Sequence, residues 1–518
     1  MTTNRRTFLN RIPWITAAAM QPVALARAGP KSTDEPVSIG SRRELFLDDF
    51  MIEQLSGKAR LRLHHPAFRE VVIEHDAPWE GNASGSHTVL RDGDGYRMYY
   101  RGWNFKTLPG KLVFDGTPVT CLARSRDGIH WVKPDLGIVE YQGSKQNNII
   151  LDGIGTHNFM PVIDENPACP REERYKALAG IKREGGLFAY KSPDGVHWSL
   201  MQEKPVITNG AFDSANLAFW DPTIGRYRAY WRTFTGGVTE KDNWKPAGFR
   251  AIRTATSGNF LDWDNHADLT YFDSPEEHLY INNVAPYYRA PHILVGTPQR
   301  YIERGWSASM RALPDLEKRE LRASSHLRYG TALTETLIMA SRDGVKFKRW
   351  NEGFIRPGIQ RDDSWYYAHQ TVAWQMLETK AARAGAPNEL SFYASSGYWH
   401  GKGGKMSRYT LRLDGFVSAS APMRGGELLT RVLKFEGSKL RLNFATSAAG
   451  TLKVEMQDAE GRPIPGYSLP EADETFGNEI DRTVSWNGST DVSRIAGQAI
   501  RLRFILQDAD LYAFQFGE

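Results

Sequence analysis

The sequence predicts an all-β protein: a five-bladed β-propeller followed by a C-terminal β-sandwich. Three observations predict it. A seven-residue turn motif recurs along the chain, strand-like segments precede each copy, and alternating strands continue without the motif after about Gly425. Aromatic residues make up 12% of the chain, and Gly (47) and Pro (27) are plentiful, as turn-rich β-folds require. With 518 residues, the chain is long enough for more than one domain.

The turn motif has the pattern Ser-x-Asp-Gly-x-x-aromatic. Three copies match in full, one is degenerate and the last is partial; in chain order they span residues 125–131, 192–198, 257–263, 341–347 and 412–416, with the degenerate copy at 257–263. Asp-Gly forms a tight turn because Gly tolerates positive φ. We expect the aromatic residue to pack between neighbouring sheets. The alternative is a β-sandwich with coincidental Asp-Gly turns, which the repeated aromatic position disfavours.

Strand-like segments precede the copies of the motif. The nearer strands are expected at Thr120–Arg124, Leu187–Tyr190, Arg250–Thr254, Leu337–Ala340 and Ser407–Leu413. Another strand is expected before each of them, at Arg97–Tyr100, Arg174–Ala179, Arg226–Tyr230, His292–Gly296 and Leu390–Ala394. A further, inner strand is expected at the start of each unit, so that a unit has an inner, a middle and an outer strand and ends at the turn motif. Five units of this kind predict a five-bladed propeller over residues 40–425.

Three other segments complete the predicted organisation. Residues 427–518 alternate polar and apolar positions without the motif, so we expect a β-sandwich there. Leu45–Phe50 is expected to be an N-terminal strand that completes the last blade, with a structural role for Asp48 and Asp49. The segment 303–328 interrupts the fourth blade; its residues Met310–Leu321 are expected to form a helix that covers the central mouth.

The N-terminus resembles a bacterial twin-arginine export signal over residues 1–28. Arg5 and Arg6 are followed by Phe8-Leu9, by an apolar stretch from Ile12 to Ala26, and by small residues suited to cleavage. The alternative is a basic N-terminus with no targeting role. The apolar stretch is too short and interrupted for a membrane span. We therefore expect a periplasmic or secreted protein.

Charge and cysteine content exclude several classes of partner and site. The formal net charge of +5 includes four arginines that precede residue 29, and without them the charge is +1. This small net charge does not indicate binding to nucleic acid or to an anionic membrane. Two cysteines, Cys121 and Cys169, could form one pair, but they exclude a disulfide scaffold and do not have zinc-site spacing.

Three carboxylates stand where inner strands are expected to begin, at the mouth of the propeller: Glu80, Asp213 and Glu277. Cleavage of a glycosidic bond requires two carboxyl groups in different environments. We expect Glu277 to be the general acid and Glu80 the base or nucleophile. Asp213 is expected to tune the pKa of the acid and to orient substrate. Each residue taken singly favours a structural role, and it is the matching position of all three in the repeat that favours chemistry.

Histidines, amides and aromatic residues near the same strand starts are candidates for substrate binding. They are Trp79, Asn82, His87, His157, Asn216, His278, Tyr280, Trp365, Tyr366 and His369. Aromatic rings offer flat apolar faces to sugars. The four histidines indicate a polar channel or a metal site. We assign no metal ligand and expect no required cofactor, with a structural cation such as calcium as an open alternative.

Several segments resemble a group of exported bacterial proteins common in planctomycetes. They are Arg43–Asp49, Pro78–Asn82, Tyr96–Gly102, Glu173–Ala179, Phe219–Pro222, Glu277–Tyr280 and Arg408–Phe416. That group is similar to the five-bladed glycoside hydrolases of families 32, 43, 62 and 68. The two-domain layout looks like family 32, and the carboxylates on blades one, three and four look like family 43. The characteristic motifs of family 32 are absent, so the resemblance implies the layout and the acidic positions but no substrate.

These observations predict a secreted glycoside hydrolase that cleaves an oligo- or polysaccharide, furanosides included. A first alternative is a polysaccharide lyase that uses Tyr280 or His157 as base against a uronate neutralised by Arg or a cation. A second alternative is a sugar-binding propeller without turnover. In each case we expect carbohydrate as the partner, no nucleic acid, and no membrane after cleavage of the signal.

Overall fold

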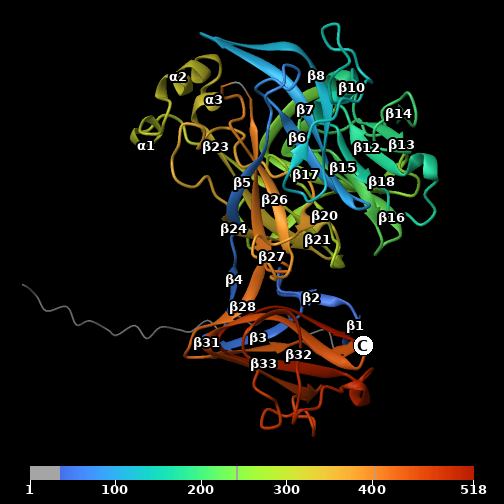
Figure 1. The fold of residues 1–518 in the computed structure, drawn as a ribbon, viewed down its shortest axis with the longest axis vertical. Coiled ribbons are helices and arrows are strands. Elements are labelled where there is room, and N and C mark those ends of the chain that lie inside the picture. Colours follow the sequence, from blue (N-terminus) through green and yellow to red (C-terminus); the bar gives the residue numbers. More distant parts are fainter. Residues whose placement is uncertain (1–34, 241–242, 402) are drawn as a thin grey trace, which may run out of the picture. The chain divides into compact units, whose positions relative to one another are not determined.

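The computed structural model describes residues 35–240, 243–401 and 403–518, and the expected export signal at 1–28 lies outside them. The described chain is 52% strand and 6% helix. Its strands form six sheets (Figure 1). Five of these have four to six strands and follow one another along the chain, and the sixth has ten strands.

The first three sheets are antiparallel and run outward from a short first strand. The first sheet contains β6 (Gly85–Asp92), β7 (Gly95–Leu108), β8 (Lys111–Ser125), β9 (Trp131–Val132) and β10 (Ile149–Asp152). The second contains β11 (Met160–Ile163), β12 (Tyr175–Ala179), β13 (Phe188–Ser192) and β14 (Ser199–Leu200). The third contains β15 (Leu217–Asp221), β16 (Arg226–Glu240), β17 (Asn243–Ser257) and β18 (Trp263–Asp268).

The remaining two small sheets each recruit a strand from elsewhere in the chain. The fourth contains β20 (Ala285–Tyr287), β21 (Ala290–Gly296), β22 (Gln299–Glu303), β23 (Ala332–Ser341) and β24 (Lys346–Ile355), with β19 (Thr270–Phe272) parallel to β24. The fifth contains β25 (Leu377–Thr379), β26 (Glu389–Ser396), β27 (Lys405–Arg412) and β5 (Ala67–Glu74). Short 3₁₀ turns occur at Thr156–Asn158, Arg171–Glu173, Lys182–Glu184 and Ser493–Ile495.

The first strands of the five small sheets surround a common space. The strand β6 contacts both β11 of the second sheet and β25 of the fifth. A cavity of ≈ 460 Å³ at one end of these strands has lining residues from all five, including Leu90, Val162, Phe219, Ala285 and Leu377. The five sheets therefore close into a ring.

The turn motif forms the expected tight turn, and its own side chains stabilise it. In the second sheet, the Ser192 hydroxyl accepts a hydrogen bond from the Gly195 N–H at 2.9 Å. The Asp194 carboxylate accepts bonds from the N–H groups of Val196 and His197 at 2.8 and 2.9 Å. Gly195 has φ 71°, and a Cβ there would come within 2.6 Å of the Tyr99 hydroxyl. Glycine is required because a neighbouring sheet approaches so closely.

A buried tyrosine joins four of the five pairs of neighbouring sheets. The hydroxyl of Tyr99 in the first sheet donates to the Gly195 carbonyl of the second at 2.9 Å. Two more bonds have the same form: Tyr230 donates to the Gly344 carbonyl at 2.8 Å and Tyr393 to the Gly128 carbonyl at 2.6 Å. In the fourth, Tyr287 donates to the Asp414 carboxylate of the turn at 2.7 Å.

The aromatic residue of each of these four motifs packs edge-on against the same tyrosine, as expected. The pairs are Tyr99 with Trp198, Tyr230 with Phe347, Tyr287 with Phe416 and Tyr393 with Trp131, at centroid distances of 5.2 to 6.4 Å. The pairs join the first sheet to the second, the third to the fourth, the fourth to the fifth and the fifth to the first.

The joint between the second and third sheets has different chemistry. The degenerate motif there places Phe260 at the glycine position, with φ 69°. Instead of meeting a turn, the Tyr227 hydroxyl of the third sheet donates to the Asp164 carboxylate of the second at 2.7 Å. The Lys176 ammonium also donates to Asp164 at 2.7 Å, and both of these charged side chains are buried. A buried ion pair with a tyrosine thus replaces the tyrosine-to-turn bond.

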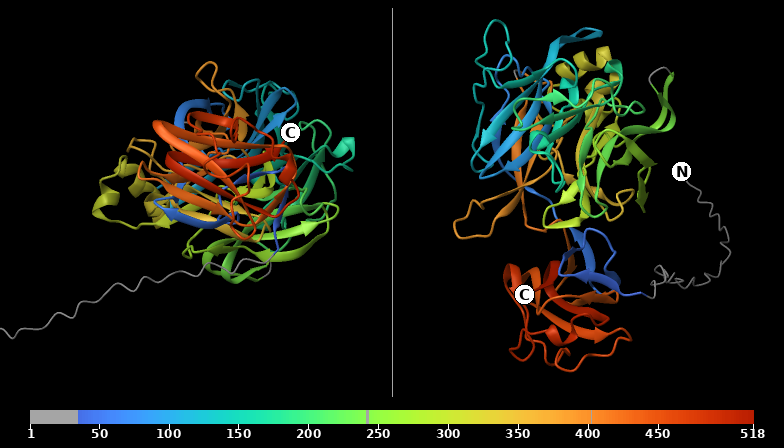
Figure 2. Two further views of the ribbon diagram at one scale, coloured as in Figure 1. Left: turned by 90° about the horizontal axis from the view of Figure 1, so that it is seen from below. Right: turned by 90° about the vertical axis from the view of Figure 1, so that its right-hand side faces the viewer.

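The ten-stranded sheet combines both ends of the described chain, as the dark-blue and red strands in Figures 1 and 2 show. Its N-terminal strands are β1 (Val37–Gly40), β2 (Arg43–Leu45), β3 (Ile52–Gly57) and β4 (Arg60–Leu63). Its C-terminal strands are β28 (Val417–Ala421), β29 (Gly426–Thr430), β30 (Leu433–Phe435), β31 (Lys439–Asp458), β32 (Asn478–Thr483) and β33 (Ile500–Gly517).

This pairing corrects the expectation that residues 40–63 belong with the propeller and that Leu45–Phe50 completes its last blade. The strand β2 pairs with the long β33, and β5 completes the fifth sheet beside β27. Arg342, in the turn of the fourth sheet, binds Asp48 at 2.8 Å and Glu44 at 2.9 Å. Asp48 is therefore a structural anchor, as expected.

The interruption of the fourth sheet is helical, as expected, with α1 (Ala308–Arg311), α2 (Leu316–Ser325) and α3 (Leu327–Thr331). Arg319 of α2 is fully buried; it stacks on the Tyr366 ring at 3.9 Å and donates to the Trp365 carbonyl at 2.8 Å. These contacts fix the helices against the segment before the fifth sheet. Both cysteines, Cys121 and Cys169, are free thiols.

Replacing Tyr393 by Phe tests the joint between the fifth and first sheets. The Gly128 carbonyl would lose the bond from Tyr393 and keep only the 3.2 Å bond from Trp131 Nε1, so we expect the free energy of unfolding to fall by about 0.5–1.5 kcal/mol. Tyr141→Phe is the control, because that hydroxyl makes only a 3.4 Å bond at the surface, and a change within about 0.5 kcal/mol is expected. Denaturant unfolding measures both. Equal losses in the two variants would contradict a special role for the buried bond.

Candidate functional site

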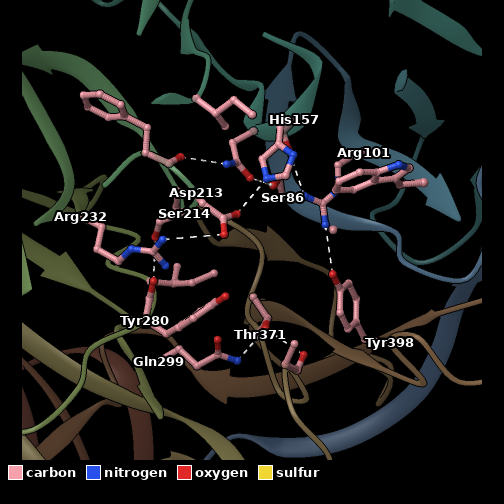
Figure 3. Close-up of a pocket in the computed structure, with 18 of the residues that line it drawn as sticks. Ser86, Arg101, His157, Asp213, Ser214, Arg232, Tyr280, Gln299, Thr371 and Tyr398 are labelled. Atoms are coloured by element: carbon pink, nitrogen blue, oxygen red, sulfur yellow. Dashed lines mark hydrogen bonds and ion pairs between the residues drawn. The ribbon is translucent and has the colours of Figure 1, made fainter. Parts of the chain in front are cut away.

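A cavity of ≈ 430 Å³ lies where the first strands of the five small sheets begin. Each sheet contributes residues from just before or at the start of its first strand, and these are Ser84, Gly85, Ser86, His87, His157, Asn158, Met160, Ala211, Phe212, Asp213, Ser214, Ala215, Tyr280, Ile281, Asn283, Tyr367, Ala368, Thr371 and Val372. This is the mouth at which the sequence predicted the site. We call it the Asp213 cavity, after the one carboxylate among its described lining residues (Figure 3).

The Asp213 side chain faces the open cavity and is 67% exposed. Its carboxylate accepts a hydrogen bond from His157 Nε2 at 2.8 Å, and Arg232 Nη2 lies 3.9 Å away. Enclosure by the cavity walls raises the pKa of Asp213, but the bond from His157 and the positive charges of Arg232 and Arg101 outweigh it and hold the pKa well below the ordinary 3.8. At neutral pH, Asp213 is therefore an ionised, accessible carboxylate.

His157 positions Asp213. Its side chain is 9% exposed, follows the left-handed Gly155 in a 3₁₀ turn, and packs edge-on against Trp103 at 5.2 Å. Burial lowers the pKa of His157 below 6.5, since the opposing bond to Asp213 does not fully compensate. A neutral imidazole thus donates from Nε2, and Nδ1 is buried without a partner among the described residues.

Two arginines from equivalent strands flank Asp213 in Figure 3. Arg101 lies on β7 and Arg232 on β16, and both are at least nine-tenths buried. Arg101 donates to the carbonyls of His157 and Ala83 at 3.1 and 3.3 Å, which fixes its orientation. Arg232 lies over the Tyr280 ring at 5.0 Å. The cavity therefore has a fixed positive charge on both sides of its carboxylate.

Aromatic residues form much of the cavity wall. They are Trp103, Phe105, Phe114, Phe212, Trp244, Tyr280, Tyr329, Tyr367, Tyr398 and Trp399. The hydroxyls of Tyr280 and Tyr367 share a 2.5 Å hydrogen bond, and the Tyr398 hydroxyl accepts a 3.4 Å bond from Arg101. Such a wall suits the apolar faces of sugar rings, with hydroxyls available to bind the polar edges.

Glu80 does not line the cavity, contrary to the prediction. It is fully buried, and its carboxylate accepts hydrogen bonds from Tyr100 at 2.6 Å, Lys133 at 2.7 Å and the Ala77 N–H at 2.8 Å. Burial raises the pKa of Glu80, but the contact with His75 and the bonds from Lys133 and Tyr100 outweigh it and lower the pKa to about 2. Glu80 is an ionised structural carboxylate.

A pair of histidines connects Glu80 to the cavity. His75 Nδ1 lies 3.5 Å from Glu80 Oε1, and His75 Nε2 lies 2.9 Å from His87 Nε2. His87 lines the cavity, and burial lowers its pKa well below 6.5. His75 therefore lies between the buried Glu80 carboxylate, which its Nδ1 approaches without a hydrogen bond, and His87 of the cavity lining.

Glu277 also lies outside the cavity lining. Arg300 binds it at 2.7 and 3.3 Å and Arg349 at 2.9 Å, and its side chain is 20% exposed. The prediction failed because β20 begins only at Ala285, later than the sequence suggested. Tyr280 therefore takes the place, four or five residues before the first strand, that Glu80 and Asp213 occupy in their sheets. The three carboxylates do not converge.

Of the ten predicted binding residues, His87, His157 and Tyr280 line the cavity. The other seven do not: Trp79, Asn82, Asn216, His278, Trp365, Tyr366 and His369. Most of these support local structure instead. For example, Asn82 and Asn216 bind the backbone of Phe105 and Phe212, and His278 Nδ1 accepts from the Arg250 N–H. His369 is fully buried behind the cavity.

Sequence reasoning missed the two arginines and most of the aromatic wall. A signal for the arginines was present, because Tyr99-Tyr100-Arg101 and Tyr230-Trp231-Arg232 repeat the same pattern on corresponding strands. The first tyrosine of each triplet joins neighbouring sheets, and the arginine two positions later reaches the cavity.

Among the described residues, no three His, Cys, Asp or Glu side chains gather closely enough to hold a metal ion. No helix in the described ranges is long and apolar enough to span a membrane.

No family model and no curated protein matches the chain. The solved structures similar to it include glycoside hydrolases. A family 43 arabinoxylan arabinofuranohydrolase from Bacillus subtilis is 12% identical, with 85% of this chain and 96% of that chain covered and a TM-score of 0.39. A glycosyl hydrolase from Bacteroides ovatus is 14% identical, with 67% and 94% covered and a TM-score of 0.37.

A structure described for the family 130 mannoside phosphorylases, which contain hydrolases that target β-1,2 mannosidic linkages in Candida mannan, is 15% identical. It covers 68% of this chain and 96% of that chain, with a TM-score of 0.38. At these identities and TM-scores, the likeness to these structures supports no conclusion about the activity of this chain.

The buried Glu80 carboxylate predicts a specific dependence of stability on pH. Its pKa is about 2 in the folded protein and about 4.5 when unfolded, so its stabilising contribution is complete above pH 4.5 and lost as the pH falls towards 2. The contribution is on the order of 3 kcal/mol. We expect the stability difference between wild type and Glu80→Gln to shrink by that amount over this range in denaturant unfolding. A difference that stays constant with pH would contradict the assignment.

Proposed function

We propose that this protein is a glycoside hydrolase that cleaves a glycosidic bond of an oligo- or polysaccharide in the Asp213 cavity. The observation that carries the proposal is an ionised, solvent-facing carboxylate at the base of a pocket with aromatic walls. This combination provides a surface that binds sugar rings and a charge that can act on the anomeric carbon.

The proposal includes the architecture and the location of the protein. The ring of five sheets is interpreted as a five-bladed β-propeller, and the ten-stranded sheet as a β-sandwich that both chain ends build. The N-terminal segment 1–28 is proposed to direct export by the twin-arginine route, which places the enzyme in the periplasm or outside the cell. The chemistry proposed below uses side chains only and requires no cofactor, and a structural cation remains compatible with it.

Asp213 is proposed to act in its ionised form. Because its pKa is held low, it is a poor proton donor at neutral pH and a suitable base or nucleophile. Its negative charge would stabilise the positive charge that develops on the sugar ring in the transition state. The bond from His157 keeps one carboxylate oxygen oriented, so the other is available to substrate or water.

The proton for the leaving oxygen is proposed to come from His87, because the described lining residues provide no second carboxylate. In this step a doubly protonated His75, held next to the Glu80 carboxylate, gives its Nε2 proton to Nε2 of a neutral His87, and His87 gives its Nδ1 proton to the leaving oxygen, so that both imidazoles end neutral. Glu80 would thus take part in catalysis through two histidines, rather than as the base or nucleophile that the sequence predicted.

A polysaccharide lyase is a second candidate, and one observation favours it. Tyr280 and Tyr367 share a short hydrogen bond at the cavity, and Arg232 lies over the Tyr280 ring. A tyrosine base with an arginine that neutralises a uronate is the arrangement that β-elimination requires. The two reactions give different products, because elimination leaves an unsaturated sugar that absorbs ultraviolet light and hydrolysis does not.

Assays of the purified mature protein on a broad glycan panel test the proposal. We expect new reducing ends without ultraviolet absorbance, and a loss of about 10²- to 10⁴-fold in kcat for Asp213→Asn. Asp135→Asn, at an exposed position, is the matched control and should keep full activity. An increase in absorbance would identify the lyase instead, and binding without any product would identify a non-catalytic propeller.

The proposed proton path predicts that the effect of His87→Gln on kcat depends on the leaving group of the substrate. On the glycan that the panel identifies, His87→Gln should lower kcat by about 10²-fold or more. An aryl glycoside with an activated leaving group needs no proton, so its hydrolysis should be largely retained in His87→Gln and lost in Asp213→Asn. Equal losses of both substrates in His87→Gln would contradict the role of His87 as proton donor.

A further inference from the structure

Arg232 has hydrogen-bonding groups that nothing in the described chain satisfies. Its side chain is 8% exposed, and its Nε and Nη1 atoms are buried without a hydrogen-bond partner. Its charge contact with Asp213 is 3.9 Å long, which exceeds a hydrogen bond. A guanidinium carries five N–H donors, and leaving buried donors unpaired costs free energy. Figure 3 shows this group directed into the cavity beside Asp213.

Arg101 has the same features on the other side of Asp213. Carbonyls of His157 and Ala83 hold its two terminal nitrogens, and its Nε is buried without a partner among the described residues. Its guanidinium also packs against the Trp103 ring at 5.3 Å. Because backbone carbonyls fix Arg101, its position does not depend on the presence of a ligand.

Positive charge is concentrated at this cavity. Its described lining residues include Arg101, Lys182, Arg183 and Arg232 but only one carboxylate, Asp213. The whole sequence has 65 Lys and Arg against 60 Asp and Glu, so the cavity is far more cationic than the chain on average. A neutral sugar would not require this excess, whereas an anionic one would be attracted by it.

We propose that Arg232, together with Arg101, forms a subsite for the oxyanion substituent of an acidic sugar, either a carboxylate or a sulfate ester. The planar fork of a guanidinium matches both groups in a bidentate geometry. The anion would bind Arg232 at Nη2, the terminal nitrogen nearest Asp213, because Nε and Nη1 are buried from the cavity, and Asp213 would act on the adjoining glycosidic bond. The substrate class is therefore an acidic glycan. This inference rests on the proposed function, since it assigns the cavity to a sugar.

Binding measurements on the inactive Asp213→Asn protein, in low and moderate salt, test the subsite with two pairs of probes. One pair is an oligogalacturonate and its methyl ester, and the other is a sulfated galactan oligosaccharide and its desulfated form. We expect the charged member of one pair to bind at least 10-fold more tightly than its neutral counterpart, and the preference to weaken with salt. The pair that shows the preference identifies carboxylate or sulfate as the substituent.

Variants of Arg232 in the same background locate the effect. Arg232→Gln should abolish the preference for the charged probe, and Arg232→Lys, which keeps the charge without the fork, should retain only part of it. Arg126→Gln, at an exposed position in a turn, is the control and should leave the preference intact. Circular dichroism of each variant establishes that it is folded; if Arg232→Gln unfolds, the Lys variant provides the test.

The outcomes separate this inference from the proposed function. Equal affinity for charged and neutral probes, or a preference that Arg232 variants do not change, would overturn the subsite. If wild-type protein cleaves neutral glycans in an Asp213-dependent reaction, the proposed function holds and the subsite fails. If the Arg232-dependent preference is present but no glycan on the panel is cleaved, the subsite holds and the proposed enzyme activity fails.

Discussion

A hydrogen bond from a buried tyrosine to the turn of a neighbouring sheet is the interaction on which this ring of sheets depends. It recurs between four pairs of sheets, each time with an aromatic residue of the turn packed edge-on against the same tyrosine. A tyrosine suits this position because its ring fills the space between sheets while its hydroxyl satisfies a buried acceptor. The turn motif thus has one structural purpose, which is to fix the spacing and order of the sheets.

The same strands build the cavity. Side chains two positions apart on a strand point to the same face, so a residue two positions after the joining tyrosine faces the same way. Tyr99 is followed by Arg101 and Tyr230 by Arg232, and in the fifth sheet Ser395 follows Tyr393 and also lines the cavity. The contacts that close the ring therefore also set the positions of Arg101 and Arg232. This explains how the two guanidinium groups can stay in place although some of their buried nitrogens have no partner among the described residues.

How far the sequence predicted this structure depended on the distance over which each signal acts. The turn motif and the strands before it are local, so the five sheets and the mouth with Asp213, His157, His87 and Tyr280 were predictable. Glu277 was misplaced because β20, the first strand of its sheet, begins only at Ala285, and no local pattern marks that start. Pairing of β2 with β33 joins segments more than 450 residues apart, and no local pattern records it. Glu80 is buried because His75 and Lys133 surround it, and only the fold brings Lys133 there.

The joint between the second and third sheets gives the ring an asymmetry. There, Tyr227 and Lys176 both donate to the buried Asp164 carboxylate, whereas at the joint between the fourth and fifth sheets the buried carboxylate that Tyr287 meets, Asp414, belongs to the turn motif itself and pairs with Arg43 and Arg289. The hydrogen bond between His157, before the second sheet's first strand, and Asp213, before the third's, crosses the same pair of sheets at the cavity. Asp213 and His157 thus lie at the same seam as Tyr227, Asp164 and Lys176, so the polar contacts of the cavity and those of this joint link the same two sheets.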